Sequence, residues 1–215
     1  MNVPAHIAGR IVGSTPEWFS SAREASAVHR ILDAAGRGFG TVIPLHVGMH
    51  DRTTRPVAAD PEAERHIFYP LPPAEGELSW LPGARARFEA ACDSAAADLH
   101  EPVLWPHSAC AVGDAPSLAT FLRARPRWRF IFDPISLLTP AMLDNAEEHL
   151  SRWCEVLGTH PRAAAVVIGS GLVVGDRVIP CGDGEPRGMN YLGSALLSLI
   201  ARCCHDSLSV ITPHA

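Results

Sequence analysis

Three apolar runs in this sequence stop at a polar residue beside a proline, and this repeated ending constrains the fold more than any other feature. The endings are Leu104-Trp105-Pro106-His107, Phe132-Asp133-Pro134 and Ile211-Thr212-Pro213-His214. Helical patterns separate the runs, and short β-rich runs that alternate with helices are typical of a parallel sheet. The polar endings would then share the rim at the carboxyl ends of the strands, where such folds carry their functional groups.

Composition indicates one globular domain over residues 1–215. The chain is 47% hydrophobic and 19% charged, in the range of ordinary folded proteins. A net charge of -5 and the lack of a basic run argue against nucleic acid or an anionic membrane as a partner. The sequence has no membrane-spanning apolar stretch and no secretory signal pattern near Met1, so we expect a cytoplasmic protein.

Two residue types narrow the chemistry further. All 18 basic residues are arginine, which excludes a Schiff-base lysine and a phosphate-binding-loop lysine. The six cysteines show no Cys-x-x-Cys spacing, and Cys203-Cys204 lie in an apolar helical run. We therefore expect buried free thiols rather than disulfides or a zinc site built from cysteine.

Hydrophobic periodicity predicts about six strands, with helices between most of them. Strands are expected at 7–12, 41–47, 102–105, 128–132, 163–168 and 208–211. Helices are expected from 14–17 to 35, and at 84–99, 117–125, 140–157 and 192–204. The segment 48–82 is rich in proline and charge and has no periodicity, so we interpret it as a long irregular excursion at the rim.

Six segments share their order and spacing with the strand endings of a known family. They are Leu45-His46-Val47-Gly48, Leu104-Trp105-Pro106-His107, Phe132-Asp133-Pro134-Ile135-Ser136, Val167-Ile168-Gly169-Ser170, Gly182-Asp183-Gly184-Glu185 and Ile211-Thr212-Pro213-His214. From about Thr41 onward, the chain thus resembles the xylose isomerase-like TIM barrels, the sugar phosphate isomerase/epimerase superfamily. The resemblance implies a parallel (β/α) barrel, a sugar or sugar phosphate as ligand, and a divalent metal.

The departures from the family pattern fall on its metal ligands. The two metal-binding glutamates of the family match Trp105 and Thr212, whereas Asp133 keeps the identity of a ligand and His46 is a second candidate. Hard-oxygen sites need several converging carboxylates. The resemblance therefore implies an ancestral metal site that is lost, or one rebuilt with histidine for Zn, Mn or Co.

The same match predicts an incomplete barrel. It assigns residues 7–12 to the third strand, which leaves no residues for the first two βα units. A complete eight-stranded barrel typically has about 250 residues. An open barrel exposes two sheet edges, so we expect a partner subunit or a second copy of the chain, as in a homodimer, to cover it.

The candidate catalytic residues have structural alternatives. Asp133 is predicted either as a metal ligand or general base, or as a cap on the N–H groups of Ser136 or Leu137. The rim histidines His46, His107 and His214 either converge with Asp133 as ligands and acid–base groups, or His107 and His214 remain as supports of glutamates that are gone.

The candidate substrate-binding residues are similarly open. Arg187 and Glu185 lie in the glycine-rich segment 182–188, which is either an anion cradle or a tight turn. Trp80 either stacks on a sugar, packs against a partner or packs in a core. Arg123, Arg125, Arg127 and Arg129 precede a strand, so we place them opposite the rim, on a solvated or partner-facing surface.

Two classes of function remain. One is a sugar (phosphate) isomerase or epimerase that uses Asp133, His107 and His214 for catalysis and Arg187 for the anion. The other is a non-catalytic relative that binds a small ligand or another subunit on the same scaffold. The lost glutamates favour the second class, and the histidines at the rim favour the first.

Overall fold

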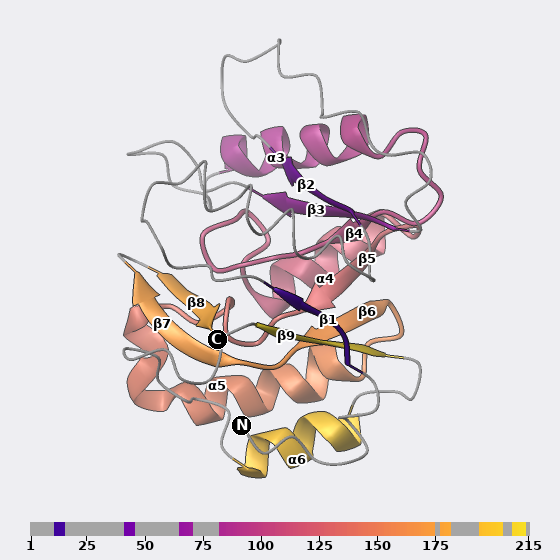
Figure 1. The fold of residues 1–215 in the computed structure, drawn as a ribbon. Helices are drawn as coiled ribbons and strands as arrows, with labels where there is room; N and C mark the ends of the chain where they lie inside the picture. The colour runs from indigo at the N-terminus through magenta and orange to yellow at the C-terminus, as the bar shows by residue number, and fades with distance from the viewer. Residues whose placement is uncertain are drawn as a thin grey trace.

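The computed structural model describes residues 11–15, 41–45, 65–70, 82–174, 177–181, 194–203 and 208–213. They form a parallel sheet, a two-stranded hairpin and several helices (Figure 1). The predicted α/β class with a parallel sheet is therefore confirmed.

The parallel sheet has seven strands in the order β1-β9-β6-β5-β4-β3-β2, and every neighbouring pair is parallel. The strands are β1 (Ile11–Thr15), β2 (Thr41–Leu45), β3 (His66–Pro70), β4 (Val103–Leu104), β5 (Arg129–Phe132), β6 (Ala163–Val167) and β9 (Ser209–Pro213). Strand β1 pairs directly with β9, the last strand of the chain. The first and last strands of the chain are therefore neighbours in the parallel sheet.

Strand β3 corrects the interpretation of 48–82 as wholly irregular. It lies between β2 and β4 and pairs with β2 over its whole length, from Thr41↔His66 to Leu45↔Pro70. Its apolar stretch is only three residues long, Ile67 to Tyr69, and charged and proline residues flank it. A run this short carries too little periodicity to be recognised, although pairing on both edges makes it a central strand. The sheet accordingly has seven strands rather than six.

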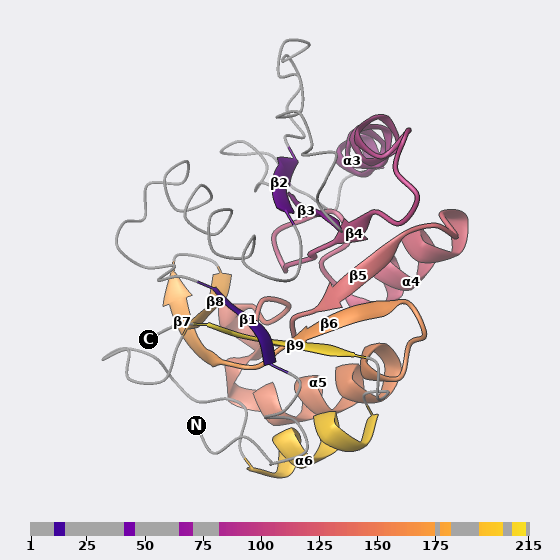
Figure 2. The ribbon, with the colours of Figure 1, turned by 45° about the vertical axis from the view of Figure 1, so that its right-hand side comes forward.

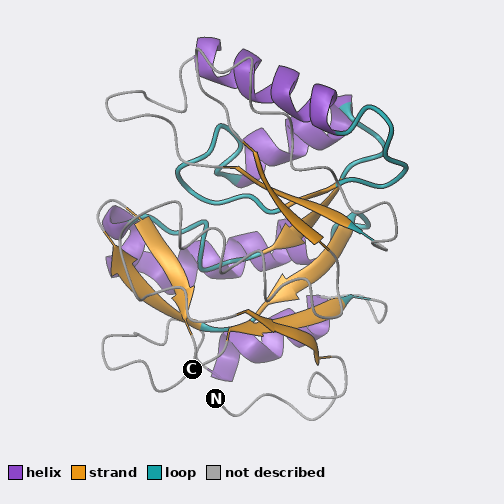
Figure 3. Cartoon of the chain, turned by 45° about the horizontal axis from the view of Figure 1, so that its top comes forward, coloured by secondary structure: helices purple, strands orange, loops and turns teal. Residues whose placement is uncertain are grey.

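A second correction concerns the residues after β6. The sequence predicts a simple strand end at Gly169-Ser170-Gly171, whereas β7 (Ser170–Val174) and β8 (Arg177–Cys181) form an antiparallel hairpin. The hairpin is a separate two-stranded sheet (Figure 3). Because it follows β6 after two residues, it stands at the carboxyl-terminal rim of the parallel sheet.

The helices that fall on described residues match the predicted ones within a few residues. They are α3 (Pro82–Ala95), α4 (Ala115–Ala124), the 3-10 helix η1 (Pro140–Asn145), α5 (Ala146–Trp153), the π-helical turn η2 (Cys154–Gly158) and α6 (Ser194–Cys203). Helix α4 begins at a reciprocal cap: the Asp114 side chain accepts from Ser117 N–H, and Ser117 Oγ accepts from Asp114 N–H. The predicted first helix lies outside the described residues, except that positions 14 and 15 at its predicted start belong to β1.

The two faces of the sheet pack differently. Helices α3 to α6 lie on the outer side of an arc that the strands follow from β2 through β5 to β1 (Figure 2). Phe68, Leu104 and Phe130 join helix residues in the larger apolar cluster on that side. Alternating positions such as Ile67, Val103 and Ile131 form a second cluster made of residues on or beside the strands alone. Both faces of the central strands are thus buried, as parallel sheets require.

Candidate functional site

The carboxyl ends of β3, β4 and β5 bring together a buried polar group on the inner face of the sheet. Tyr69 is the penultimate residue of β3, Trp105 and His107 follow β4, and Asp133 follows β5. Trp105 and Asp133 are 0% exposed and His107 is 2% exposed. The parallel register places these endings side by side, because Leu104 is opposite both Phe68 and Phe130. We call Tyr69, Trp105, His107, Asp133 and Ser136 the rim cluster.

The Asp133 carboxylate accepts three hydrogen bonds within the rim cluster. Trp105 Nε1 donates to Oδ2 at 3.0 Å. Ser136 donates twice, from its N–H to Oδ1 at 3.1 Å and from its hydroxyl to Oδ2 at 2.6 Å. The predicted cap of Asp133 on Ser136 is confirmed, and the indole bond across 28 residues of sequence is new.

Burial dominates the electrostatics of Asp133. It raises the pKa of this carboxyl above its usual value, while the hydrogen bonds from Ser136 and Trp105 act in the opposite direction. Desolvation penalises the charged form, and the donated hydrogen bonds stabilise it only in part. Asp133 is therefore a carboxyl held by neutral donors, in a setting that favours its protonated state.

His107 is held through both nitrogens of its ring. Nδ1 accepts from the N–H of Ala109 at 3.2 Å, and Nε2 lies 2.7 Å from the carbonyl oxygen of Pro70. A backbone N–H only donates and a carbonyl only accepts, so the neutral ring carries its proton on Nε2. The ring also stacks on Tyr69, with centroids 5.0 Å apart. His107 thus joins the end of β3 to the loop after β4.

That loop is tied tightly to the rim cluster. Ser108 N–H donates to the carbonyl oxygen of Ser136 at 2.8 Å, which links it to the loop after β5. Gly113 closes the turn against the same segment, since a Cβ there would lie 2.7 Å from the Ser108 oxygen and 2.8 Å from the His107 oxygen. Only glycine fits this close approach without movement of the backbone.

Tyr69, a member of the rim cluster, and Arg177, whose charge acts on it, were not among the residues predicted from the sequence. The Tyr69 ring packs edge-on against Trp105 with centroids 6.0 Å apart. Burial raises the pKa of the Tyr69 hydroxyl well above its usual range, and the positive charge of Arg177 on β8 opposes this rise. Both residues lie on strands that the sequence patterns did not predict, so no signal marked them as rim residues.

The structure describes two of the seven predicted site residues, Asp133 and His107, and brings them to one rim. The other five lie outside the described residues: His46, Trp80, Glu185, Arg187 and His214. The carboxylate oxygens of Asp133 and the ring nitrogens of His107, which would have to bind the metal, already have the protein partners given above. This pair therefore does not fit a divalent metal. Within the described ranges, no group of three or more His, Cys, Asp or Glu side chains is placed to hold a metal ion.

The tautomer of His107 leads to a stability prediction. We expect His107→Phe, which keeps the stacking on Tyr69, to lower the free energy of unfolding by about 1–3 kcal/mol, because it leaves the Pro70 carbonyl and the Ala109 N–H without partners in a buried site. Urea denaturation measures the change. The exposed His100 provides the control, since His100→Phe should change the free energy by less than about 0.5 kcal/mol. Equal effects of the two substitutions would contradict the two hydrogen bonds assigned to the His107 ring.

Comparison with known proteins adds no family. No protein-family model matches this chain, and no curated protein matches it significantly. Among the helices that the structure describes, none combines the length and the apolar character needed to cross a membrane.

Proposed function

We propose that the sheet belongs to a TIM-barrel-like fold. The strand order runs β2-β3-β4-β5-β6-β9 and then returns to β1, which is the cyclic order of a parallel (β/α) barrel opened between β1 and β2. Two further features support this proposal: the side chains on the inner face of the sheet are buried, and the helices lie on its outer face. The resemblance of the strand endings to the xylose isomerase-like barrels supports it independently.

We propose further that the chain is a non-catalytic binding or assembly protein on an isomerase-like scaffold. The observation that carries this proposal is the hydrogen bond from Trp105 Nε1 to Asp133. In the resembled family, the position of Trp105 belongs to a glutamate, and two neighbouring carboxylates are ionised together only when a cation offsets their repulsion. An indole N–H donates to Asp133 and removes that requirement. Trp105 also fills the space in which a metal and a sugar would lie.

The metal content of the purified chain tests this proposal. We expect protein prepared without a His tag or chelator to contain far less than one equivalent of Zn, Mn, Co or Fe, measured by plasma mass spectrometry. Metal added and then removed by gel filtration should leave the same result. Near-stoichiometric metal that is lost in His107→Ala and His214→Ala variants would contradict the proposal and support a rebuilt metal site.

One observation keeps a second candidate, a sugar or sugar phosphate isomerase or epimerase. Asp133 has a raised pKa and shares the rim cluster with Tyr69 and His107, and such a carboxyl is suited to general acid–base chemistry. In this alternative, Asp133, His107 and His214 would transfer protons, and Arg187 would contact the substrate anion. The substrate would lose a proton from carbon, so incubation of aldose and ketose phosphates in D2O would incorporate deuterium. Incorporation that disappears in Asp133→Asn would favour the enzyme.

We propose a cytoplasmic location and a homodimer on separate grounds. Cys92 and Cys110 are free, buried thiols, which suits a reducing compartment. Strands β1 and β2 end the parallel sheet, and an unpaired edge is a common place for a second copy to bind. Sedimentation equilibrium should show a dimer mass, and a monomer at all concentrations would contradict the second proposal.

A further inference from the structure

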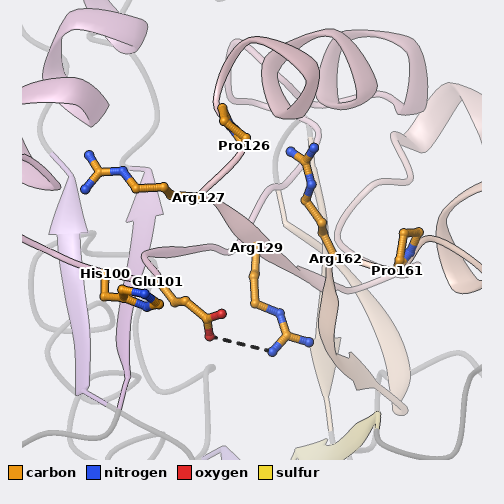
Figure 4. A pocket seen from close by; sticks show the side chains of 7 residues that line it. All are labelled: His100, Glu101, Pro126, Arg127, Arg129, Pro161 and Arg162. Atoms are coloured by element: carbon orange, nitrogen blue, oxygen red, sulfur yellow. Dashed lines mark ion pairs between the residues drawn. The ribbon is translucent and has the colours of Figure 1, made fainter.

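A group of charged side chains lies at the opposite end of the strands from the rim cluster. A pocket of about 420 Å³ opens there, lined by Arg127, Arg129, Arg162, His100, Glu101 and two prolines (Figure 4). Glu101 precedes β4, Arg129 begins β5, and Arg162 directly precedes β6. Arg127 and Arg129 were predicted to lie opposite the rim, and their position at the amino-terminal ends of the strands agrees with that prediction. We call this feature the arginine pocket.

The arginine pocket concentrates positive charge in a chain of net charge -5. Its lining holds three guanidinium groups and one carboxylate, that of Glu101, which lies 4.0 Å from Arg129. Two arginines outside the pocket are matched more closely: Arg125 lies 2.7 Å from Asp93, and Arg85 lies 2.8 Å from Glu89. The pocket therefore keeps an excess of positive charge that the described side chains do not neutralise.

Backbone carbonyls position the three guanidinium groups. Arg127 donates from Nη1 to the Leu99 oxygen at 2.9 Å, and Arg129 donates from Nη2 to the Ala163 oxygen at 3.0 Å. Arg162 donates from Nη1 to the carbonyls of Leu122 and Arg125 near the end of α4. Neutral carbonyls orient a guanidinium without cancelling its charge. Each guanidinium has five N–H donors, so these bonds leave further donors for a ligand.

We propose that the arginine pocket binds a small organic molecule that carries at least two phosphate or carboxylate groups. Figure 4 shows the three arginine side chains distributed around the pocket instead of meeting at one point. A single small anion would therefore reach only part of the positive charge, whereas a ligand with two separated anionic groups would reach more of it. The planar fork of arginine suits both phosphate and carboxylate. The volume is in the range of small-molecule sites.

Calorimetric titration of the full chain with defined anions tests the proposal. The probes are inorganic pyrophosphate, citrate and inorganic monophosphate, at low ionic strength because salt screens exposed charges. We expect one saturable site for pyrophosphate or citrate, with monophosphate at least about tenfold weaker because it reaches fewer donors. Binding of pyrophosphate alone assigns phosphate groups, and binding of citrate alone assigns carboxylates. Either result supports the site, and saturation by neither overturns it.

Three substitutions make the test specific to the pocket. Arg127→Gln should weaken binding about two- to fivefold, the loss expected for one exposed charged contact. Glu101→Gln should tighten binding, because it removes the carboxylate that competes for Arg129. Arg152→Gln is the matched control, since Arg152 is an exposed arginine paired with Glu148 on α5. Equal affinities of the Arg127 and Arg152 variants, or weaker binding by Glu101→Gln, would overturn the proposal.

Arg162 is left unchanged in this design because its bonds to two carbonyls near the end of α4 are partly buried, whereas the bond from Arg127 to Leu99 is exposed. Its replacement would change folding and binding together. Circular dichroism and thermal unfolding of the Arg127 and Glu101 variants should match those of the unsubstituted chain, so that any change in affinity reports on the pocket itself.

Discussion

Trp105→Ala is expected to be among the most destabilising substitutions in this chain. Removal of a buried tryptophan typically lowers the free energy of unfolding by about 3–5 kcal/mol, through lost burial and the cavity that remains. Trp105 is 0% exposed, and Tyr69 packs against its ring. The substitution also takes one hydrogen-bond donor from the buried Asp133 carboxylate. Urea denaturation followed by circular dichroism measures the combined loss.

Trp105→Phe separates the hydrogen bond from the packing. Phenylalanine keeps most of the ring volume and loses the indole N–H, so we expect a loss of about 1–3 kcal/mol from the undersatisfied carboxylate. Trp128→Phe is the matched control. Trp128 is 3% exposed and packs against Phe68 and Phe121. Its replacement changes only packing contacts and should lower stability by less than about 1.5 kcal/mol.

A double-mutant cycle gives the sharper result. In an Asp133→Asn background, Trp105→Phe should cost less than in the unsubstituted chain, because the acceptor of the indole bond is changed. Equal costs in both backgrounds would mean that the indole bonds no more strongly to the Asp133 carboxylate than to an amide oxygen at the same position. The proposed replacement of a metal-bridged carboxylate pair by an indole–carboxylate pair would then lose its support.

The fold and the rim cluster differ in how far sequence reasoning predicts them. Long periodic segments such as α4 and the apolar strand β5 are marked by local patterns, and both are found close to the predicted places. The bond between Asp133 and Ser136 is also local, because a spacing of three residues suffices for a side-chain cap. Properties that a short segment determines alone are therefore predictable from it.

Contacts that depend on strand register are not predictable in this way. Trp105 reaches Asp133 only because β4 and β5 pair in a particular register, and nothing within either segment specifies it. His107 contacts the carbonyl of Pro70, which ends β3, a strand hidden in a charged and proline-rich context. His107 and Asp133 were predicted as candidate site residues, yet each also has a partner far away in the sequence, at separations of 37 and 28 residues. The partners, rather than the residue types, determine what these groups are able to do.

The raised pKa of Asp133 predicts a pH dependence of stability with a definite sign. The folded state holds this proton more tightly than the unfolded chain, whose aspartate has a pKa of about 3.9. Between that value and the pKa in the folded state, the native protein binds more protons than the unfolded one. Stability therefore falls as the pH rises through this interval, and it becomes independent of Asp133 at higher pH.

Comparison with Asp133→Asn isolates this effect from other titrating groups. The difference in free energy of unfolding, the Asn variant minus the unsubstituted chain, should increase with pH above about 4, with a slope of at most about 1.4 kcal/mol per pH unit. It should become constant once Asp133 is ionised in the folded state. Urea denaturation at half-unit steps from pH 4 to 8 measures this difference. Parallel stability curves for the two proteins would contradict a raised pKa.

Ser136→Ala tests the cause of the shift as well as its sign. The Ser136 hydroxyl donates to Oδ2 at 2.6 Å and stabilises the ionised carboxyl against burial. Its removal should raise the pKa of Asp133 further, so the decline in stability should extend to higher pH than in the unsubstituted chain. A decline that ends at lower pH would mean that the hydroxyl stabilises the protonated acid instead. In that case Asp133 would act as the donor to Ser136, and the rim cluster would be built around a neutral carboxylic acid.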